Sequence, residues 1–118
     1  MSGYFEETLI KSKYKTVTLQ DAATTTGNGT IQAIENYQNL TIGISGTSTS
    51  RTVEFHVVDE NGIDDVIKGT RPKDFFQATS TSGNDETYQF DVTGYVSFYA
   101  KITAISGGNV TIKGRLVA

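Results

Sequence analysis

Apolar and polar residues alternate along several short stretches of this chain, and turn-forming residues separate the stretches. The clearest case is LTIGIS, in which Leu40, Ile42 and Ile44 occupy every second position. Successive side chains of a β-strand point to opposite faces, so a period of two places these three on one face. The pattern therefore predicts strands that each turn one face towards a hydrophobic core.

The same alternation recurs from residue 16 to residue 117, with turns such as Gly107-Gly108-Asn109 between the stretches. Including one strand at GTIQAI and one starting near Ile63, about eight strands with regular turn signals predict an all-β, antiparallel β-sandwich or jelly-roll-like domain. The predicted inward side chains are Val17, Leu19, Leu40, Ile42, Ile44, Val53, Phe55, Val57, Tyr88, Phe90, Val92, Val96, Phe98, Ala100, Ile102, Ala104, Val110, Ile112 and Leu116.

At 118 residues the chain suits a single domain, which we assign to residues 14–118. Residues 1–13 lack clean alternation and are interpreted as an N-terminal arm, with a flexible arm, a short helix, an added strand and a frayed terminus as alternatives. Tyr4 and Phe5 favour an arm that docks on a neighbour. The irregular segment from Gly69 to Thr81 is expected to cross between the sheets, with Phe75, Phe76 or both plugging the sandwich edge.

Charge and composition argue against several classes of function. The net charge is -3 and the densest basic run, Lys11 to Lys15, follows two glutamates, so a nucleic-acid partner is not expected. With no cysteine, neither disulfides nor thiolate metal sites arise. The N-terminus lacks an apolar signal region and no stretch approaches a membrane span, so neither export on its own nor a membrane partner is expected.

The only histidine lies in FHVVDENGIDDV, close to several carboxylates. Alternation places His56 and Glu54 on the outer face, roughly 7 Å apart along the strand. A zinc site needs three or four ligands, and the calcium-loop spacing fails, so no metal is predicted, even at Asp59, Asp64 and Asp65. The favoured interpretation is a hairpin with a two-residue Asn61-Gly62 turn. No catalytic residue and no cofactor are predicted.

Tyrosines are the stronger candidates for a binding surface. Alternation places Tyr95 and Tyr99 together on the outer face of the longest strand, and Tyr37 lies in a loop before Leu40. A stripe of exposed tyrosines stacks on sugar rings or forms the core of a protein interface. A covering loop or arm is the structural alternative. Candidate ligand or interface residues are Tyr95, Tyr99, Tyr37, Tyr4 and Phe5.

Two segments, YQNLTIGISGTSTSRTVEFHVVDENG and DETYQFDVTGYVSFYAKITAISGGNVTIKGRLVA, resemble small β-sandwich proteins encoded among the structural genes of tailed phages and prophages. DVTGY and SGGNVTIKG carry most of the resemblance. It implies a non-enzymatic virion structural or accessory protein of the decoration, fibre, tail or baseplate type. Such a protein would be assembled in the host cytoplasm, form a homo-oligomer and pack on other virion proteins of the capsid or tail. The alternative is a carbohydrate-binding module that recognises a host surface glycan.

Overall fold

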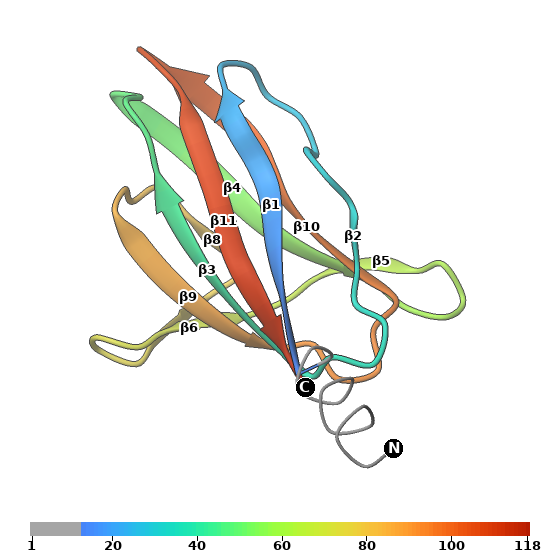
Figure 1. Cartoon of the computed structure of the whole chain (residues 1–118). Helices are drawn as coiled ribbons and strands as arrows, with labels where there is room; N and C mark the ends of the chain where they lie inside the picture. Colours follow the sequence, from blue (N-terminus) through green and yellow to red (C-terminus); the bar gives the residue numbers. More distant parts are fainter. Residues whose placement is uncertain (1–12) are drawn as a thin grey trace, which may run out of the picture.

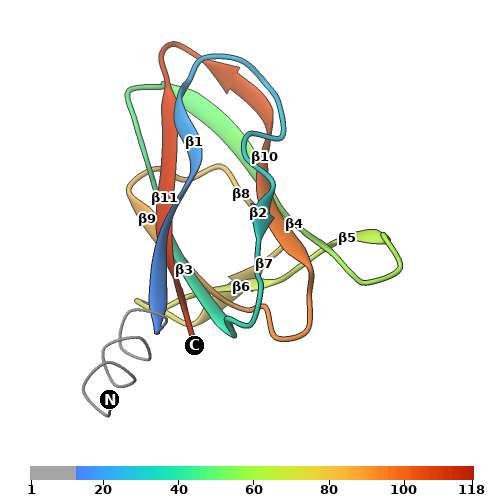
Figure 2. The ribbon, with the colours of Figure 1, turned by 45° about the vertical axis from the view of Figure 1, so that its right-hand side comes forward.

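The structure, a computed structural model, describes residues 13–118, and two antiparallel β-sheets packed face to face make up this part of the chain. Figures 1 and 2 show the two layers from directions 45° apart. The predicted all-β sandwich is confirmed. The predicted arm falls almost wholly outside the described residues, as do Tyr4 and Phe5. No helix within residues 13–118 has the length and apolar character to cross a membrane.

Each sheet is built from strands that are distant in sequence. The six-stranded sheet has the order β1 (Tyr14–Ala23), β11 (Val110–Val117), β3 (Asn39–Ser45), β9 (Glu86–Asp91), β6 (Gly69–Arg71) and β7 (Phe76–Ala78). The five-stranded sheet has the order β2 (Gln32–Ala33), β10 (Ser97–Ser106), β4 (Ser50–Val58) and β5 (Asp64–Val66), while β8 (Ser80–Thr81) also pairs with β4. The eleven strands are the eight expected ones and three short ones between residues 69 and 81.

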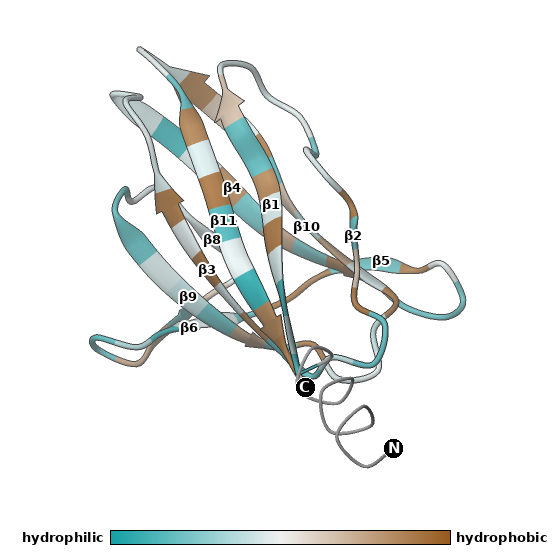
Figure 3. Ribbon diagram, viewed as in Figure 1, coloured by the Kyte–Doolittle hydropathy of each residue, from teal (hydrophilic) through white to brown (hydrophobic). Residues whose placement is uncertain are grey.

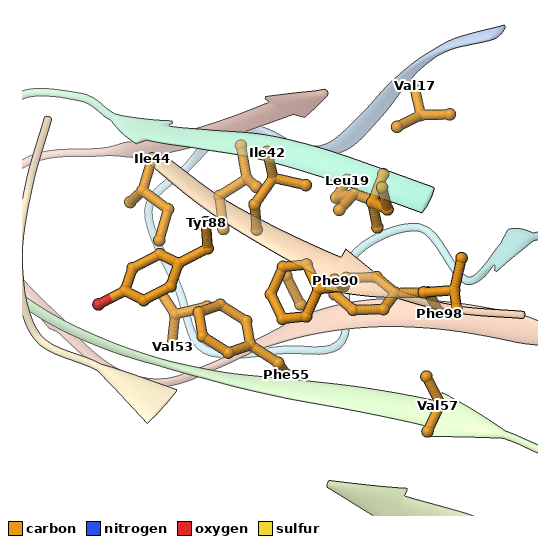
Figure 4. Packing of buried hydrophobic residues seen from close by; sticks show 14 of the residues in the cluster. Val17, Leu19, Ile42, Ile44, Val53, Phe55, Val57, Tyr88, Phe90 and Phe98 are labelled. Carbon is orange, nitrogen blue, oxygen red and sulfur yellow. The ribbon is translucent and has the colours of Figure 1, made fainter. Parts of the chain in front are cut away.

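The core lies between the sheets. Apolar and polar residues alternate along several strands, as the bands of brown and teal in Figure 3 show. Seventeen of the predicted inward residues are buried, and Ile34 joins them. Aromatic rings occupy the centre, where Phe55 packs with its centroid 5.2 Å from that of Tyr88 and 4.8 Å from that of Phe90 (Figure 4). These rings come from opposite sheets, so they join the two layers directly.

The prediction is wrong at both ends of the longest strand. Val96 and Ala104 are exposed, although both were expected in the core. β10 begins only at Ser97, and its pairing with β4 shifts register between Ile102 and Ala104. An irregularity of this kind changes which face the following side chains occupy, and alternation alone does not reveal it.

The segment 69–81 does cross between the sheets, since β6 and β7 belong to one sheet and β8 to the other. However, the predicted aromatic plug is wrong, because Phe75 and Phe76 are both exposed. They lie at the tip and on the outgoing strand of a β6–β7 hairpin, where the chain turns away from the core. Ile67, between β5 and β6, packs against the core instead.

The loop between β1 and β2 closes one open edge of the sandwich. Gly27 exchanges two backbone hydrogen bonds with Ile102 of β10, and Thr30 donates one to Leu19 of β1. The buried Gln20 adds a side-chain link, because its Nε2 donates to the carbonyl oxygens of Ala100 at 2.9 Å and Gly27 at 3.2 Å. A strand of one sheet is thereby tied to a strand of the other.

We expect Gln20→Leu to lower the free energy of unfolding by about 1–3 kcal/mol, because it removes the donor and leaves a buried carbonyl without that partner. Chemical denaturation with urea measures the difference. The exposed Gln77→Leu is the matched control and should stay within about 0.5 kcal/mol of the wild type. Equal losses in the two variants would contradict the structural role of Gln20.

Candidate functional site

The two adjacent central strands of the five-stranded sheet carry a pair of stacked rings on their outer face. His56 of β4 lies directly opposite Tyr99 of β10. Their ring centroids are 4.8 Å apart and the ring planes are within 10° of parallel. Both side chains lie on the outer face of the sheet, as the alternation predicted. Nevertheless, Tyr99 is only 5% exposed, so the expected open tyrosine stripe does not exist at this position.

Two carboxylates complete this group, which we call the His56 cluster: Glu54, His56, Asp64 and Tyr99. Asp64 Oδ1 lies 2.9 Å from His56 Nδ1, and Asp64 Oδ2 accepts a hydrogen bond from the Tyr99 hydroxyl. His56 Nε2 lies 3.0 Å from Glu54 Oε1, so the predicted proximity of Glu54 and His56 is confirmed. Each ring nitrogen therefore faces a carboxylate, and only the doubly protonated imidazolium donates to both.

Hydrogen bonding and burial shift the acidities within the His56 cluster in opposite directions. The hydrogen bond from Tyr99, joined by one from His56, holds the pKa of Asp64 below its ordinary value. Burial, reinforced by the Asp64 carboxylate, raises the pKa of Tyr99 to about 12. The carboxylate therefore stays charged and the phenol stays neutral at neutral pH. Such a pair acts as a fixed hydrogen-bonded clamp, which holds β5 against β4 and β10, rather than as a proton-transfer pair.

We expect Tyr99→Phe to raise the pKa of Asp64 towards its ordinary value, because the variant lacks the hydroxyl donor. A folded-state pKa that is depressed contributes stability above the unfolded pKa, and this contribution is lost as pH falls through the folded value. The stability deficit of the variant should therefore be present at neutral pH and shrink in acid. NMR titration of the Asp64 carboxyl carbon measures the shift directly. Tyr95→Phe is the control and should leave that titration unchanged.

The turn after β4 is a hairpin, as the sequence predicted, but its loop is one residue longer. The Asp59 amide donates to the Ile63 carbonyl at 3.0 Å, and the Gly62 amide donates to the Asp59 carbonyl at 3.0 Å. Gly62 has a φ of 80°, as the bulge position of a three-residue loop requires. The Asp59 carboxylate accepts from the amides of Asn61 and Ile63, which fixes the loop internally.

The acidic residues of this hairpin do not converge on a common point. Asp59 bonds its own loop, Asp65 accepts from the Val66 amide, and Asp64 faces the His56 cluster. Within residues 13–118 no group of three or more His, Cys, Asp or Glu side chains is arranged to hold a metal ion.

The other two candidate tyrosines come from loops. Tyr95 and Tyr37 are partly buried and pack against the core, and their amides close turns with the carbonyls of Val92 and Ile34, respectively. Tyr95 precedes the start of β10 and packs inwards, so the expectation that it shares the outer face with Tyr99 is wrong. A ligand or interface role for Tyr37, Tyr95 and Tyr99 stays a prediction.

Sequence reasoning missed two features of the surface. The pairing of Asp64 with Tyr99 joins residues 35 positions apart, and no local motif signals it. Phe75 and Phe76, in contrast, follow the turn-forming sequence Arg-Pro-Lys-Asp, and this position after a turn is a signal that they lie at a hairpin tip. They are among the most exposed large apolar side chains of the described residues.

Comparison with known proteins gives a consistent family assignment. The profile of the XepA family matches residues 13–116. The SPbeta prophage-derived protein YomS of Bacillus subtilis (strain 168) is 36% identical over 101 residues, which cover 86% of this chain and 85% of YomS. The crystal structure of YomS superposes with a TM-score of 0.84 at 34% identity, over 89% of this chain and 93% of that one.

A longer relative contains the same domain. The phage-like element PBSX protein XepA of Bacillus subtilis (strain 168) is 27% identical over 96 residues, which cover 81% of this chain and 34% of XepA. The crystal structure of the PBSX exported protein XepA superposes with a TM-score of 0.88 at 25% identity, over 90% of this chain and 38% of that one. The chain thus spans little more than a third of XepA.

Proposed function

The chain belongs to the XepA family, and from this premise we propose that it is a non-enzymatic structural or accessory protein of a phage particle that associates with copies of itself and with other virion proteins. The observation that carries the proposal is the 36% identity to the prophage protein YomS over most of both chains. The shared fold supports it, because YomS superposes over nearly its whole length. XepA, the larger relative, comes from the phage-like element PBSX.

The surface chemistry is consistent with assembly. In the His56 cluster, hydrogen bonds use both ring nitrogens and the phenol, so these groups serve to fix a hairpin. Large apolar side chains are instead exposed at two hairpins, which is typical of surfaces that contact another protein. We therefore assign the hairpins, and not the polar cluster, to the contacts within a particle.

The decisive experiment asks whether the protein is part of the particle. Phage particles are induced, purified on a density gradient and washed with salt, and the chain is then detected by mass spectrometry. We expect it to remain with the particles, and light scattering of the isolated protein to give a mass above that of a monomer. Absence from purified particles together with a strict monomer would contradict the proposal.

The alternative of a carbohydrate-binding module has lost one element of its support. It required an open platform that included Tyr99, and that ring is stacked on His56 and covered. A glycan array with the wild-type protein tests the remaining candidates, Tyr37 and Tyr95. Binding that is lost in Tyr95→Ala but kept in Tyr99→Phe would favour this alternative over a purely structural role.

A further inference from the structure

Two hairpins project from opposite sides of the same end of the sandwich, as Figures 1 and 2 both show. One is the β6–β7 hairpin, which we call the aromatic hairpin (residues 69–78). The other is the β4–β5 hairpin, whose outer part we call the acidic hairpin (residues 59–66). Neither tip is buried in the described core, and each presents large apolar side chains to the outside.

The aromatic hairpin holds its phenylalanines in an exposed but fixed position. Phe75 is 80% exposed and Phe76 53% exposed. Arg71 binds both carboxylate oxygens of Asp74 at 2.9 and 2.7 Å, binds Glu86 of β9 at 2.6 Å, and lies 5.0 Å from the centroid of the Phe76 ring. Burial by itself would raise the pKa of Glu86, but the hydrogen bonds from Thr81 and Arg71 outweigh burial, and the pKa is lowered. Glu86 therefore stays ionised and keeps its ion pair with Arg71.

Phe75 also adopts a backbone conformation that is uncommon for a side chain of its kind. Its φ is 60°, in the left-handed region that disfavours residues with a Cβ. A strained residue persists when surrounding contacts enforce it, and such residues concentrate at functional positions. A braced, strained and exposed aromatic residue is suited to insert into a partner surface, since aromatic anchors dominate the energetics of protein interfaces.

The acidic hairpin offers a surface of matching chemistry. Ile63 is 57% exposed and Val66 46% exposed, and Asp59, Glu60 and Asp65 surround them. The His56 cluster fixes β5, which carries Val66, to the sheet. This hairpin thus exposes two apolar side chains next to acidic residues.

Two lysines place positive charge at the aromatic hairpin. Lys73 lies in its turn and Lys68 precedes β6. Within residues 13–118, no ion pair uses Lys68, Lys73, or Asp59, Glu60 and Asp65 of the acidic hairpin. These charged groups thus have no ion-pair partner among the described residues, and the two tips are complementary in both apolar surface and sign of charge.

We propose that the aromatic hairpin of one copy docks on the acidic hairpin of the next copy. Phe75 and Phe76 pack against Ile63 and Val66, while Lys73 faces the acidic residues beside them. The proposal rests on the self-association in the proposed function and identifies the surfaces that carry it. Because the two contact surfaces differ and project from opposite sides of the sandwich, the contact is heterologous and repeats from copy to copy, which gives a closed ring or an open filament.

Cysteine cross-linking tests this contact, because the chain has no cysteine of its own. Gln77→Cys and Asn61→Cys variants, which place one exposed cysteine on each hairpin and keep the apolar side chains of the contact, are prepared separately, mixed and oxidised. We expect a disulfide-linked dimer as the main product of the mixture. A mixture of Gln77→Cys with Thr25→Cys is the matched control, because Thr25 is exposed in the β1–β2 loop at the other end of the sandwich, and it should give little mixed dimer.

Substitutions then measure the contribution of each component by sedimentation. Phe75→Ala should raise the dissociation constant about thirtyfold, as expected for loss of an aromatic anchor. Lys73→Glu should also weaken association, and Asp65→Lys in the same chain should restore it. Circular dichroism confirms that each variant is folded.

The outcomes separate this contact from the proposed function. Oligomers and particle-bound protein without hairpin-specific cross-links would overturn the contact and leave the proposed function standing. A chain that is monomeric at every concentration but present in particles would also overturn the contact. In that case only the part of the proposed function that concerns presence in the particle would stand. Cross-links in the mixture but not in the control support the contact whether or not the protein is found in particles.

Discussion

Replacing Phe55 by alanine is expected to lower the free energy of unfolding by about 3–5 kcal/mol, enough to abolish most of the stability of a domain of this size. The ring is fully buried, and it packs edge-on against Phe90 and tilted against Tyr88. Those two rings belong to β9 in the other sheet, so the substitution opens a cavity at the contact between the layers. Thermal and urea denaturation measure the loss.

Phe75→Ala provides a control of the same chemical change. Phe75 is exposed, so its loss removes no core contact, and alanine also has a Cβ, so the strain of the positive φ is unchanged. Stability should therefore stay within about 0.5 kcal/mol of the wild type. The pair of variants therefore separates folding from association: Phe55→Ala should strongly destabilise the domain, and Phe75→Ala should leave a stable domain that associates weakly. Similar stability losses in both would contradict the assignment of Phe55 to the core.

The core was predictable because burial in a two-sheet sandwich acts on every second residue of a strand. Leu40, Ile42 and Ile44 in β3, like Val53, Phe55 and Val57 in β4, are buried as their spacing predicts. A slip by one residue would expose all of them to water, so selection for stability leaves a clear period in the sequence. The turn at Asn61-Gly62 was predictable for a related local reason, the need for a positive φ.

Features set by contacts between distant segments were not predictable in this way. The position of Tyr95 depends on where β10 begins, and the exposure of Ala104 depends on a register shift against β4. Tyr99 was placed on the correct face, but its burial depends on His56 and Asp64 from two other strands. Alternation specifies a face of a strand; it does not specify what covers that face.

The candidate site shows the same division between local and distant information. Glu54 and His56 share a strand, and their proximity follows from the period of two. Asp64 reaches His56 only because β5 pairs with the part of β4 that carries His56. The result is a hairpin held to β4 and β10 by a polar clamp, and such a fixed position is what the contact proposed above requires.

Gly114→Ala is expected to cost about 3 kcal/mol of stability, although it adds only one methyl group. Gly114 lies in β11, the second strand of the six-stranded sheet, which is hydrogen-bonded to β1 on one side and to β3 on the other. A Cβ there would overlap the Thr41 carbonyl oxygen and would lie 2.9 Å from Ile42 Cγ2. Relief requires β11 and β3 to move apart, and this weakens the hydrogen-bonded ladder between them.

Gly43→Ala is the matched control, because Gly43 pairs with Lys113, the residue next to Gly114, in the same two-strand ladder. A Cβ at Gly43 would meet no atom within 4 Å. We expect that variant to unfold at the wild-type urea concentration or slightly above it, since alanine restricts the unfolded chain more than glycine does. Because both substitutions make the same chemical change in neighbouring strands, a difference between their midpoints measures the close approach of β3 to β11. Equal midpoints would show that the sheet accommodates the methyl group without separating these strands.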